Sequence, residues 1–457
     1  MSGVAVFLLS AIAALVPGRT APAQIDPASG DPVAALAEAR AAVERSPLEL
    51  GPVLDLARAF TALGRSEDAL SAFARARELA PVGANSSGTA SAGAGEQASA
   101  YLVPALLLRD LDRTGEAIRL LEAAADLRLG SADIYEQLAL LRLADGLVDG
   151  ALAAVDAAVA ESLESPGLDL ARGLALARDP DRRVEALSYL QRALDAGEGD
   201  RVVVHLETAD ILAAEGRFSE AVEQLRAAAE SAPEEPEVVY RLGRTLAAAG
   251  DRESARAALD SHRSLVEDRE RAAEAERLAS AQTASALSDA QRFAEEGDLE
   301  AALERLEGLS GGSEDSWAAD VHSLRAKVLF SMGRVDEAAA SVAEARNLEP
   351  NQVEHHYLEG MFLHTGRRAE DAAVALERAL ALDPGLAEAH ALLGMIAAEA
   401  GRPAVAAERM ERALQLGLDN NAPLRFNYAR VLEALGRTEE AKRQMEAFER
   451  LRQRPAQ

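Results

Sequence analysis

Histidine is the residue type whose distribution in this chain most resembles a chemical site. Five of the seven histidines lie between residues 322 and 390, and clustered imidazoles can bind a metal ion or exchange protons near neutral pH. His322, His356 and His390 are separated by 34 and 34 residues. This spacing places them in successive structural units, too far apart to share one ion. We interpret these three as packing residues, which leaves His355 and His364 as candidates for a site.

Other patterns that indicate catalysis or metal binding are missing from the sequence. The chain has no cysteine, which excludes disulfides, thiolate metal sites and thiol nucleophiles. It has no glycine-rich phosphate loop, no histidine pair at helical metal spacing and no nucleophile motif. The many Asp and Glu residues are expected on solvated helix faces. The sequence therefore predicts a protein that is not an enzyme, with no catalytic residue, metal site or cofactor.

An alanine returns at a nearly constant interval along the whole chain. Eight of the ten intervals are 34 to 36 residues, and the other two are 48 and 47 residues. A period of this length is typical of a solenoid of helical hairpins. The residues, which we call the anchor alanines, are Ala69, Ala117, Ala151, Ala186, Ala221, Ala255, Ala302, Ala338, Ala372, Ala406 and Ala441.

The same helical pattern surrounds each anchor alanine. A large apolar residue follows it by four positions and usually another alanine by seven, so that all three share one helix face. A glycine precedes the anchor by five positions in eight repeats, as expected for a residue that ends a helix. Each unit is therefore predicted to be helix A, a tight turn, helix B and a second turn. The glycines are Gly64, Gly146, Gly216, Gly250, Gly297, Gly333, Gly401 and Gly436.

This pattern resembles the tetratricopeptide repeat, with about eleven copies over roughly residues 48 to 452. The units from Tyr240 to Leu259 and from His390 to Ala413 match the family pattern well. The unit over about 167 to 200 departs from it, because Pro180 and Asp181 replace the turn glycine. The resemblance implies an all-α, right-handed superhelical solenoid of antiparallel helix-turn-helix repeats.

The resemblance also implies where a partner binds, because helix A lines the concave surface in this family. Aromatic, methionine and positively charged side chains on that surface suit an extended peptide or an amphipathic helix. The alternative is that these side chains pack against the next helix A. The family's carboxylate clamp is not reproduced in consecutive repeats. The implied partner-binding residues are Lys327, Phe330, Tyr357, Met361, His364, Met395, Phe426, Asn427 and Arg430.

Composition restricts the kind of partner. The formal net charge of −28 is spread along the chain, which disfavours nucleic acid and anionic lipid. It favours a basic or neutral polypeptide only weakly, because acidity can simply keep a long array soluble and monomeric. Aromatic residues make up 4% of the chain, so the core is expected to consist mainly of Leu, Ala and Val. We expect a monomer that binds a protein or peptide.

The first 23 residues have the features of a cleaved secretory signal. The apolar run from Val4 to Val16 is too short to cross a bilayer, and Ala21-Pro22-Ala23 is a small-x-small cleavage signature. The segment before the run has no lysine or arginine. The alternatives are an uncleaved N-terminal anchor and a mis-assigned start codon. We expect a periplasmic or secreted protein without stable membrane insertion after cleavage.

Two insertions interrupt the repeat and divide the chain. Residues 82–97 are rich in Gly, Ser and Ala and are predicted to be a flexible linker. Residues 263–283 alternate acidic and basic side chains and contain no Gly or Pro, which predicts an exposed helix within a long helix near 251–296. The other predicted segments are 24–81 with the first repeat, an N-terminal lobe at 98–262, a C-terminal lobe at 284–452 and a tail at 453–457.

The sequence therefore favours a non-enzymatic scaffold for protein–protein interaction, placed in the bacterial periplasm. A second hypothesis is a module of a cell-envelope assembly, polysaccharide-export or secretion complex. A third is carbohydrate binding by the aromatic residues of the groove.

Overall fold

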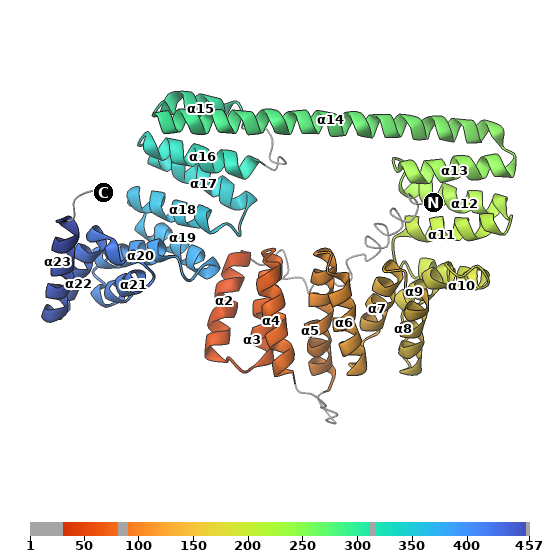
Figure 1. Cartoon of the computed structure of the whole chain (residues 1–457), viewed down its shortest axis with the longest axis horizontal. Helices are drawn as coiled ribbons and strands as arrows, with labels where there is room; N and C mark the ends of the chain where they lie inside the picture. Colours follow the sequence, from red (N-terminus) through yellow and green to blue (C-terminus); the bar gives the residue numbers. More distant parts are fainter. Residues whose placement is uncertain (1–30, 81–89, 310–316, 454–457) are drawn as a thin grey trace. The chain divides into compact units, whose positions relative to one another are not determined.

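The computed structural model describes residues 31–80, 90–309 and 317–453, and these residues contain helices and no β-strand. Figure 1 shows the order of the helices along the chain. They are α2 (Pro32–Arg45), α3 (Leu50–Ala62), α4 (Ser66–Leu79), α5 (Ala90–Asp110), α6 (Thr114–Asp126), α7 (Ala132–Ala144), α8 (Val148–Ala160), α9 (Pro166–Leu176), α10 (Arg183–Asp195), α11 (Arg201–Ala214), α12 (Phe218–Ser231), α13 (Pro236–Ala249), α14 (Arg252–Glu296), α15 (Leu299–Glu307), α16 (Ala318–Ser331), α17 (Val335–Leu348), α18 (Val353–Thr365), α19 (Ala369–Leu382), α20 (Ala387–Glu399), α21 (Pro403–Gln415), η1 (Leu418–Asn420), α22 (Ala422–Ala434) and α23 (Thr438–Arg452).

Each anchor alanine lies near the start of a helix B, and all of them are at least 96% buried. The apolar residue four positions later is fully buried in most repeats, as Leu376 and Met410 are. Glycine on helix A allows this close packing: a Cβ at Gly394 would lie 2.7 Å from Met410 Cγ, and one at Gly360 would lie 2.6 Å from Leu376 Cγ. The predicted all-α solenoid of helical hairpins is confirmed.

The turn between helices A and B requires a left-handed backbone conformation. All eight glycines predicted to end helix A have a positive φ, between 67° and 91°. Where the repeat has no glycine at this position, Asp112 and Arg367 adopt φ values of 58° and 61°. Because a side chain disfavours this region, these two residues are strained. In the repeat with Pro180, α9 ends at Leu176 and a longer turn leads into α10.

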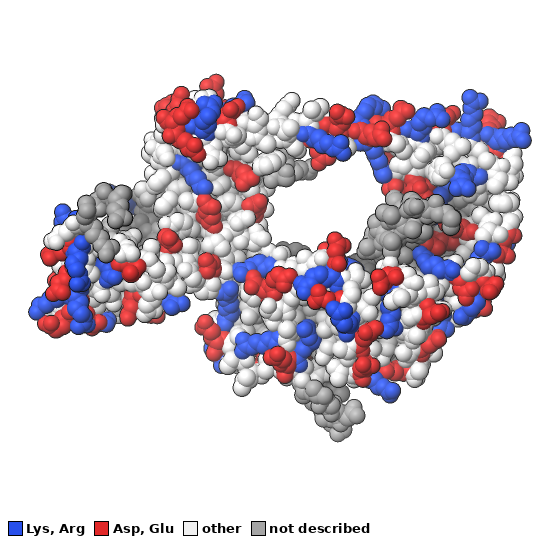
Figure 2. Space-filling view, viewed as in Figure 1, with Lys and Arg blue, Asp and Glu red and all other residues white. Residues whose placement is uncertain are grey.

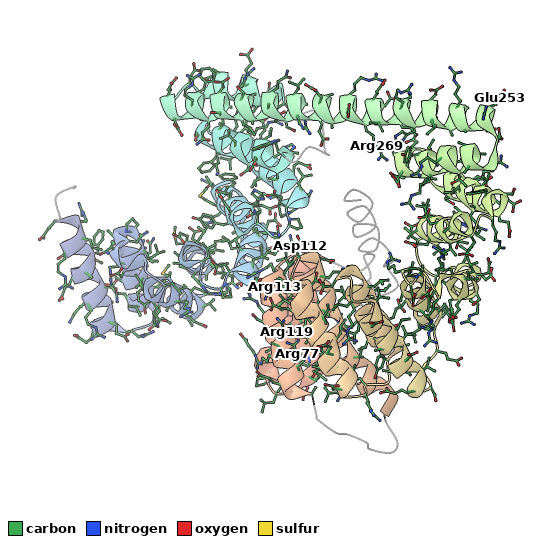
Figure 3. All side chains as sticks on the ribbon, turned by 45° about the vertical axis from the view of Figure 1, so that its right-hand side comes forward. Arg77, Asp112, Arg113, Arg119, Glu253 and Arg269 are labelled. Carbon is green, nitrogen blue, oxygen red and sulfur yellow. The ribbon has the colours of Figure 1, made fainter. Side chains whose placement is uncertain are left out.

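An ion pair recurs on the first turn of helix B. In seven repeats the arginine four positions before the anchor alanine pairs with the Asp or Glu one position before it, as Arg113 does with Glu116 at 2.8 Å. Figure 3 labels Arg113 beside Asp112 at this turn. Such pairs are exposed, and each contributes little stability. The others are Arg65–Asp68, Arg182–Glu185, Arg217–Glu220, Arg334–Glu337, Arg368–Asp371 and Arg437–Glu440.

The predicted long helix is confirmed as α14, a continuous helix of 45 residues. Its first part pairs with α13, where His262 Nδ1 lies 2.9 Å from the Pro236 carbonyl oxygen and Arg269 pairs with Glu235 at 3.0 Å. Figure 3 labels Arg269 on this helix. Between residues 263 and 283 no side chain is fully buried. Oppositely charged side chains three or four positions apart, such as Arg271 and Asp268, support this exposed stretch.

The chain forms two compact units that meet within α14, between Ala275 and Glu276. Unit 1 contains residues 46–61 and 65–275, and unit 2 contains residues 30–45, 62–64 and 276–457. In unit 2, helix α2 packs on α19, and Asp31 pairs with Arg378 at 2.5 Å. The predicted N-terminal segment 24–81 is therefore split between the two units. Figure 2 shows acidic and basic side chains interspersed on the visible face of the molecule.

The predicted linker at 82–97 is too long at its C-terminal end. Helix α5 begins at Ala90, so that residues 90–97 are helical. Alanine, glutamate and glutamine in this stretch favour a helix, and the Gly/Ser content concealed this preference. Residues 82–89 lie outside the described part of the chain, as do the predicted signal segment and most of the tail.

Candidate partner-binding groove

Two positions on helix A recur in register and form the candidate groove of unit 2. They lie fifteen and eleven residues before the anchor alanine, so they are one helical turn apart on one face. In α18, α20 and α22 they hold Tyr357 and Met361, Ala391 and Met395, and Phe426 and Arg430. Each of these helices A therefore contributes two side chains to the candidate groove, one at each of the two positions.

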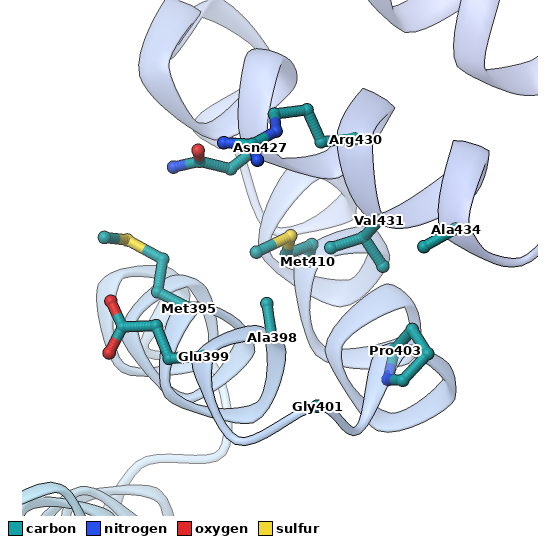
Figure 4. A pocket seen from close by; sticks show the side chains of 10 residues that line it. All are labelled: Met395, Ala398, Glu399, Gly401, Pro403, Met410, Asn427, Arg430, Val431 and Ala434. Carbon is teal, nitrogen blue, oxygen red and sulfur yellow. The ribbon is translucent and has the colours of Figure 1, made fainter.

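A pocket of about 560 Å³ lies in unit 2 where α20, α21 and α22 meet. Figure 4 shows Asn427 and Arg430 on α22 opposite Met395 and Glu399 on α20. The lining residues are Met395, Ala398, Glu399, Gly401, Pro403, Met410, Asn427, Arg430, Val431 and Ala434. Three of the nine predicted site residues, Met395, Asn427 and Arg430, therefore lie together in one pocket.

The base of the pocket is apolar and its rim carries both charges. Met410 is fully buried and Met395 is partly buried, so two flexible thioether side chains form the base. The Arg430 guanidinium is exposed and forms no ion pair with any residue that the structure describes. The Glu399 carboxylate is 61% exposed and lies 3.9 Å from His364 Nε2. The pocket can therefore take an apolar side chain flanked by an acidic and a basic group.

Four predicted residues of unit 2 do not line this pocket, because three pack on the helical core and one forms an exposed ion pair. Phe330 stacks on Phe362 with ring centroids 4.6 Å apart, and Met361 is half-buried against the same core. Lys327 Nζ pairs with Glu354 at 2.7 Å. The fourth is Tyr357, whose pKa is raised by burial and by Glu388. For these residues, helix packing or pairing explains the side-chain type.

The remaining predicted residues lie beside the pocket. His364 reaches its rim through Glu399, with 18% of its side chain exposed. Phe426 is 36% exposed, and its ring lies 5.2 Å from that of Phe448 on α23. Phe426 thus extends the surface of α22 on the same face as Arg430.

Two of the three histidines in repeat register, His356 and His390, have structural contacts. His356 Nε2 lies 2.9 Å from the Pro350 carbonyl oxygen, and His390 Nε2 lies 3.2 Å from that of Pro384. Both side chains are more than 90% buried, and burial lowers the pKa of each. Each imidazole therefore ties helix A to the proline that ends the preceding helix B. His355 is also buried, with 6% exposure, and does not line the pocket.

Sequence reasoning missed Glu399, Pro403 and Met410 among the pocket residues. Met410 was visible only as the apolar residue that follows the anchor Ala406 by four positions. Glu399 ends α20 two positions before the turn glycine, and Pro403 begins α21. Both lie at helix ends beside the turn between α20 and α21, whereas the sequence prediction considered only the inward face of helix A.

The lining residues can recognise a ligand, and the pocket contains no hydroxyl or thiol nucleophile. Within the described part of the chain, no three His, Asp or Glu side chains gather as ligands for a metal ion. Over the same residues, none of the helices combines the length and the apolar character needed to cross a membrane.

Family models for the tetratricopeptide repeat match residues 212–279, 323–387 and 391–455. Similar solved structures include MamA from Desulfovibrio magneticus RS-1, with 19% identity and a TM-score of 0.33 over 36% of this chain and 92% of that one. Another is PilF of Pseudomonas aeruginosa, with 20% identity and a TM-score of 0.34 over 40% of this chain and 79% of that one. No curated protein sequence matches the chain. The matched segments, together with the helical hairpins and their buried anchor alanines, show that the chain contains tetratricopeptide repeats.

Proposed function

We propose that this protein is a non-enzymatic scaffold that holds a segment of a partner protein in the groove of α20 and α22. The pocket lined by Met395, Met410, Asn427 and Arg430 supports this proposal most directly. It joins an adaptable apolar base to a cation that no carboxylate of the described chain neutralises. Tetratricopeptide repeats bind protein partners, and such a pocket suits one apolar anchor residue of a peptide.

The charge distribution refines the chemistry of the bound segment. Arg430 favours an acidic group on one side of the anchor residue, and Glu399 favours a basic group on the other. Both charged groups are exposed, so they set orientation and association rate more than affinity. Burial of the anchor residue against Met395 and the other apolar lining residues supplies most of the binding free energy.

Affinity capture from an extract of the native host tests the proposal. The bait is the full chain, compared with a Met395→Lys/Arg430→Glu variant and with an Arg443→Glu control. Arg443 is exposed on α23 and does not line the pocket. The control therefore makes the net charge of the protein more negative, as the pocket variant does, but at a site outside the groove. A partner recovered by the wild type and the control but lost with the pocket variant supports the proposal. Equal recovery with all three baits would refute it.

We further propose that the scaffold acts in the bacterial periplasm, as one module of a cell-envelope assembly. The apolar run Val4–Val16 and the following Ala-Pro-Ala motif support export. Fractionation of the native host tests both parts. Envelope association that high salt releases supports docking to a membrane complex, and a freely soluble periplasmic pool supports the simple scaffold. A cytoplasmic pool that begins at Met1 would contradict export.

A further inference from the structure

The repeat register shows that α13, the last helix A of unit 1, has an uncovered face. Leu206 on α11 and Tyr240 on α13 both lie fifteen residues before their anchor alanines. Leu206 is 6% exposed because α13 packs on this part of α11, with Leu206 and Val238 in one apolar cluster. Tyr240, in contrast, is 36% exposed. Ala247 is also exposed, whereas the equivalent Ala213 is half-buried.

The course of α14 explains the difference. After pairing with α13, this helix continues to Glu296 without turning back. Among the described residues of unit 1, no further helix A follows α13. His262 of α14 contacts one side of the Tyr240 ring, with centroids 5.1 Å apart. The face of α13 that the next repeat would otherwise cover, which we call the α13 face, consists of Tyr240, Arg244 and Ala247.

The charge on the α13 face differs from the charge at the interface between α11 and α13, which we call the preceding seam. Between α11 and α13, Asp210 of α11 pairs with Arg241 of α13 at 2.8 Å. The residue equivalent to Asp210 in the next repeat is Arg244, which has the opposite charge. Arg244 lies 5.7 Å from the centroid of the Tyr240 ring and forms no ion pair with any described residue. The charge of Arg244 also acts on Asp210 of α11, and a carboxylate on a helix that continues the stack would add a favourable partner for Arg244, where α13 itself brings a guanidinium.

The last helix A of unit 2 repeats this arrangement. Phe426 and Arg430 of α22 occupy the same two register positions, and Phe426 is also 36% exposed. In both units the last helix A thus carries an exposed aromatic residue followed one turn later by an arginine without an ion pair in the described chain. The α22 face belongs to the groove proposed above, and the α13 face is a separate surface.

We propose that the α13 face binds an amphipathic α-helix of a partner protein. The helix takes the place of the missing next helix A, packs small and branched apolar residues against Tyr240 and Ala247, and places an Asp or Glu on Arg244. The seam between α11 and α13 is the physical precedent, since it shows how an apolar face and one ion pair combine in this chain.

A charge-reversal experiment with the full chain tests this proposal. The probe is a fluorescent, hydrocarbon-stapled peptide with the sequence of residues 236–249, which is what covers α11 in the preceding seam. One version keeps Arg241 and the other carries Arg241→Glu. Binding is measured by fluorescence anisotropy in a Phe426→Ala/Arg430→Ala background, which removes the equivalent surface on α22.

The proposal predicts that the Glu peptide binds about tenfold more tightly than the Arg peptide. With an Arg244→Asp variant of the protein the order should reverse, and with Tyr240→Ala both peptides should bind more weakly. The proposal is wrong if the two peptides bind equally or not at all. It is also wrong if sedimentation shows a dimer of the free protein that Arg244→Asp dissociates, because the face would then bind a second copy.

Discussion

Arg367 shows how strictly the repeat imposes one backbone conformation on a single residue. It occupies the position where eight other repeats have glycine, and it takes the same left-handed conformation with φ of 61°. The chain reaches this conformation because α18 and α19 must pack antiparallel across the turn. The Arg367 side chain forms no ion pair with any residue that the structure describes, so no such pair offsets the steric strain on its Cβ.

Arg367→Gly should therefore stabilise unit 2, by about 1 kcal/mol. Urea unfolding followed by fluorescence of Trp317, which precedes α16 in the same unit, measures the change. Gly401→Ala is the matched control, and it should lower the free energy of unfolding where Arg367→Gly raises it. Its φ is 69° and a Cβ there would meet no atom within 4 Å, so only the backbone is strained. A loss of stability in Arg367→Gly would mean that the side chain has a stabilising role.

Glu136 on α7 is a carboxylate in an unfavourable environment. It packs against Gly167 at the start of α9, where a Cβ would lie 1.8 Å from Glu136 Oε2. Burial, with the nearby charges of Glu198 and Asp133, raises its pKa to about 7. Gln137 Nε2 donates a weak hydrogen bond to it at 3.4 Å. The folded protein therefore holds this proton more tightly than the unfolded chain, in which the pKa is near 4.5.

The free energy of opening α7 and α9 should consequently fall as the pH rises from about 4.5 to about 7, and stay constant above that range. Glu136→Gln removes the charge, so it should stabilise these helices at pH 8 by about 2 kcal/mol relative to the wild type. The gain should disappear towards pH 4.5. Hydrogen exchange of the α7 and α9 amides measures it. A gain that is the same at both pH values would contradict the electrostatic cause.

At the scale of the element, the features that recur with the repeat are the ones that the sequence predicts best. The eleven anchor alanines, the turn glycines and the long helix were all predicted from spacing, because tight packing at one position allows few residue types. The start of α5 at Ala90 was missed, since Gly and Ser lower helix propensity without preventing a helix. The seven recurring turn ion pairs, such as Arg334–Glu337, were also missed although their spacing is regular.

The groove was less predictable than the repeats. The register places Met395 and Arg430 on the same face as Tyr357 and Met361. It does not say which face the neighbouring helices cover, and Tyr357 and Met361 pack on the core. In unit 2, Met395 of α20 and Arg430 of α22 line the pocket where α20, α21 and α22 meet, whereas Tyr357 and Met361 of α18 do not line it. Whether a register position packs or lines a pocket thus depends on the side chains around it, which the spacing alone does not encode.

At the scale of the whole molecule, each unit consists mainly of hairpins that pack against their neighbours along the chain, and in unit 2 helix α2 also packs on α19. The outer side of α23 carries Glu439, Lys442, Arg443 and Glu446, all exposed, which gives the end of the described array a polar surface. Solenoids need such a cap to remain soluble. Stability should therefore be a sum of hairpin and seam contributions, and damage to one seam should spread only to adjacent hairpins.

Hydrogen exchange of a Gly394→Leu variant tests this claim most directly. The new side chain would collide with Met410, because a Cβ at this position already lies 2.7 Å from Met410 Cγ. We expect protection of the α20 and α21 amides to fall by about 3 kcal/mol, with smaller losses in α18, α19, α22 and α23. The helices of unit 1 should keep their protection, and Gly51→Leu, where a Cβ meets nothing within 4 Å, should lose none in unit 2. An equal loss of protection in every helix of both units would show that the chain folds as one cooperative body and would contradict the account.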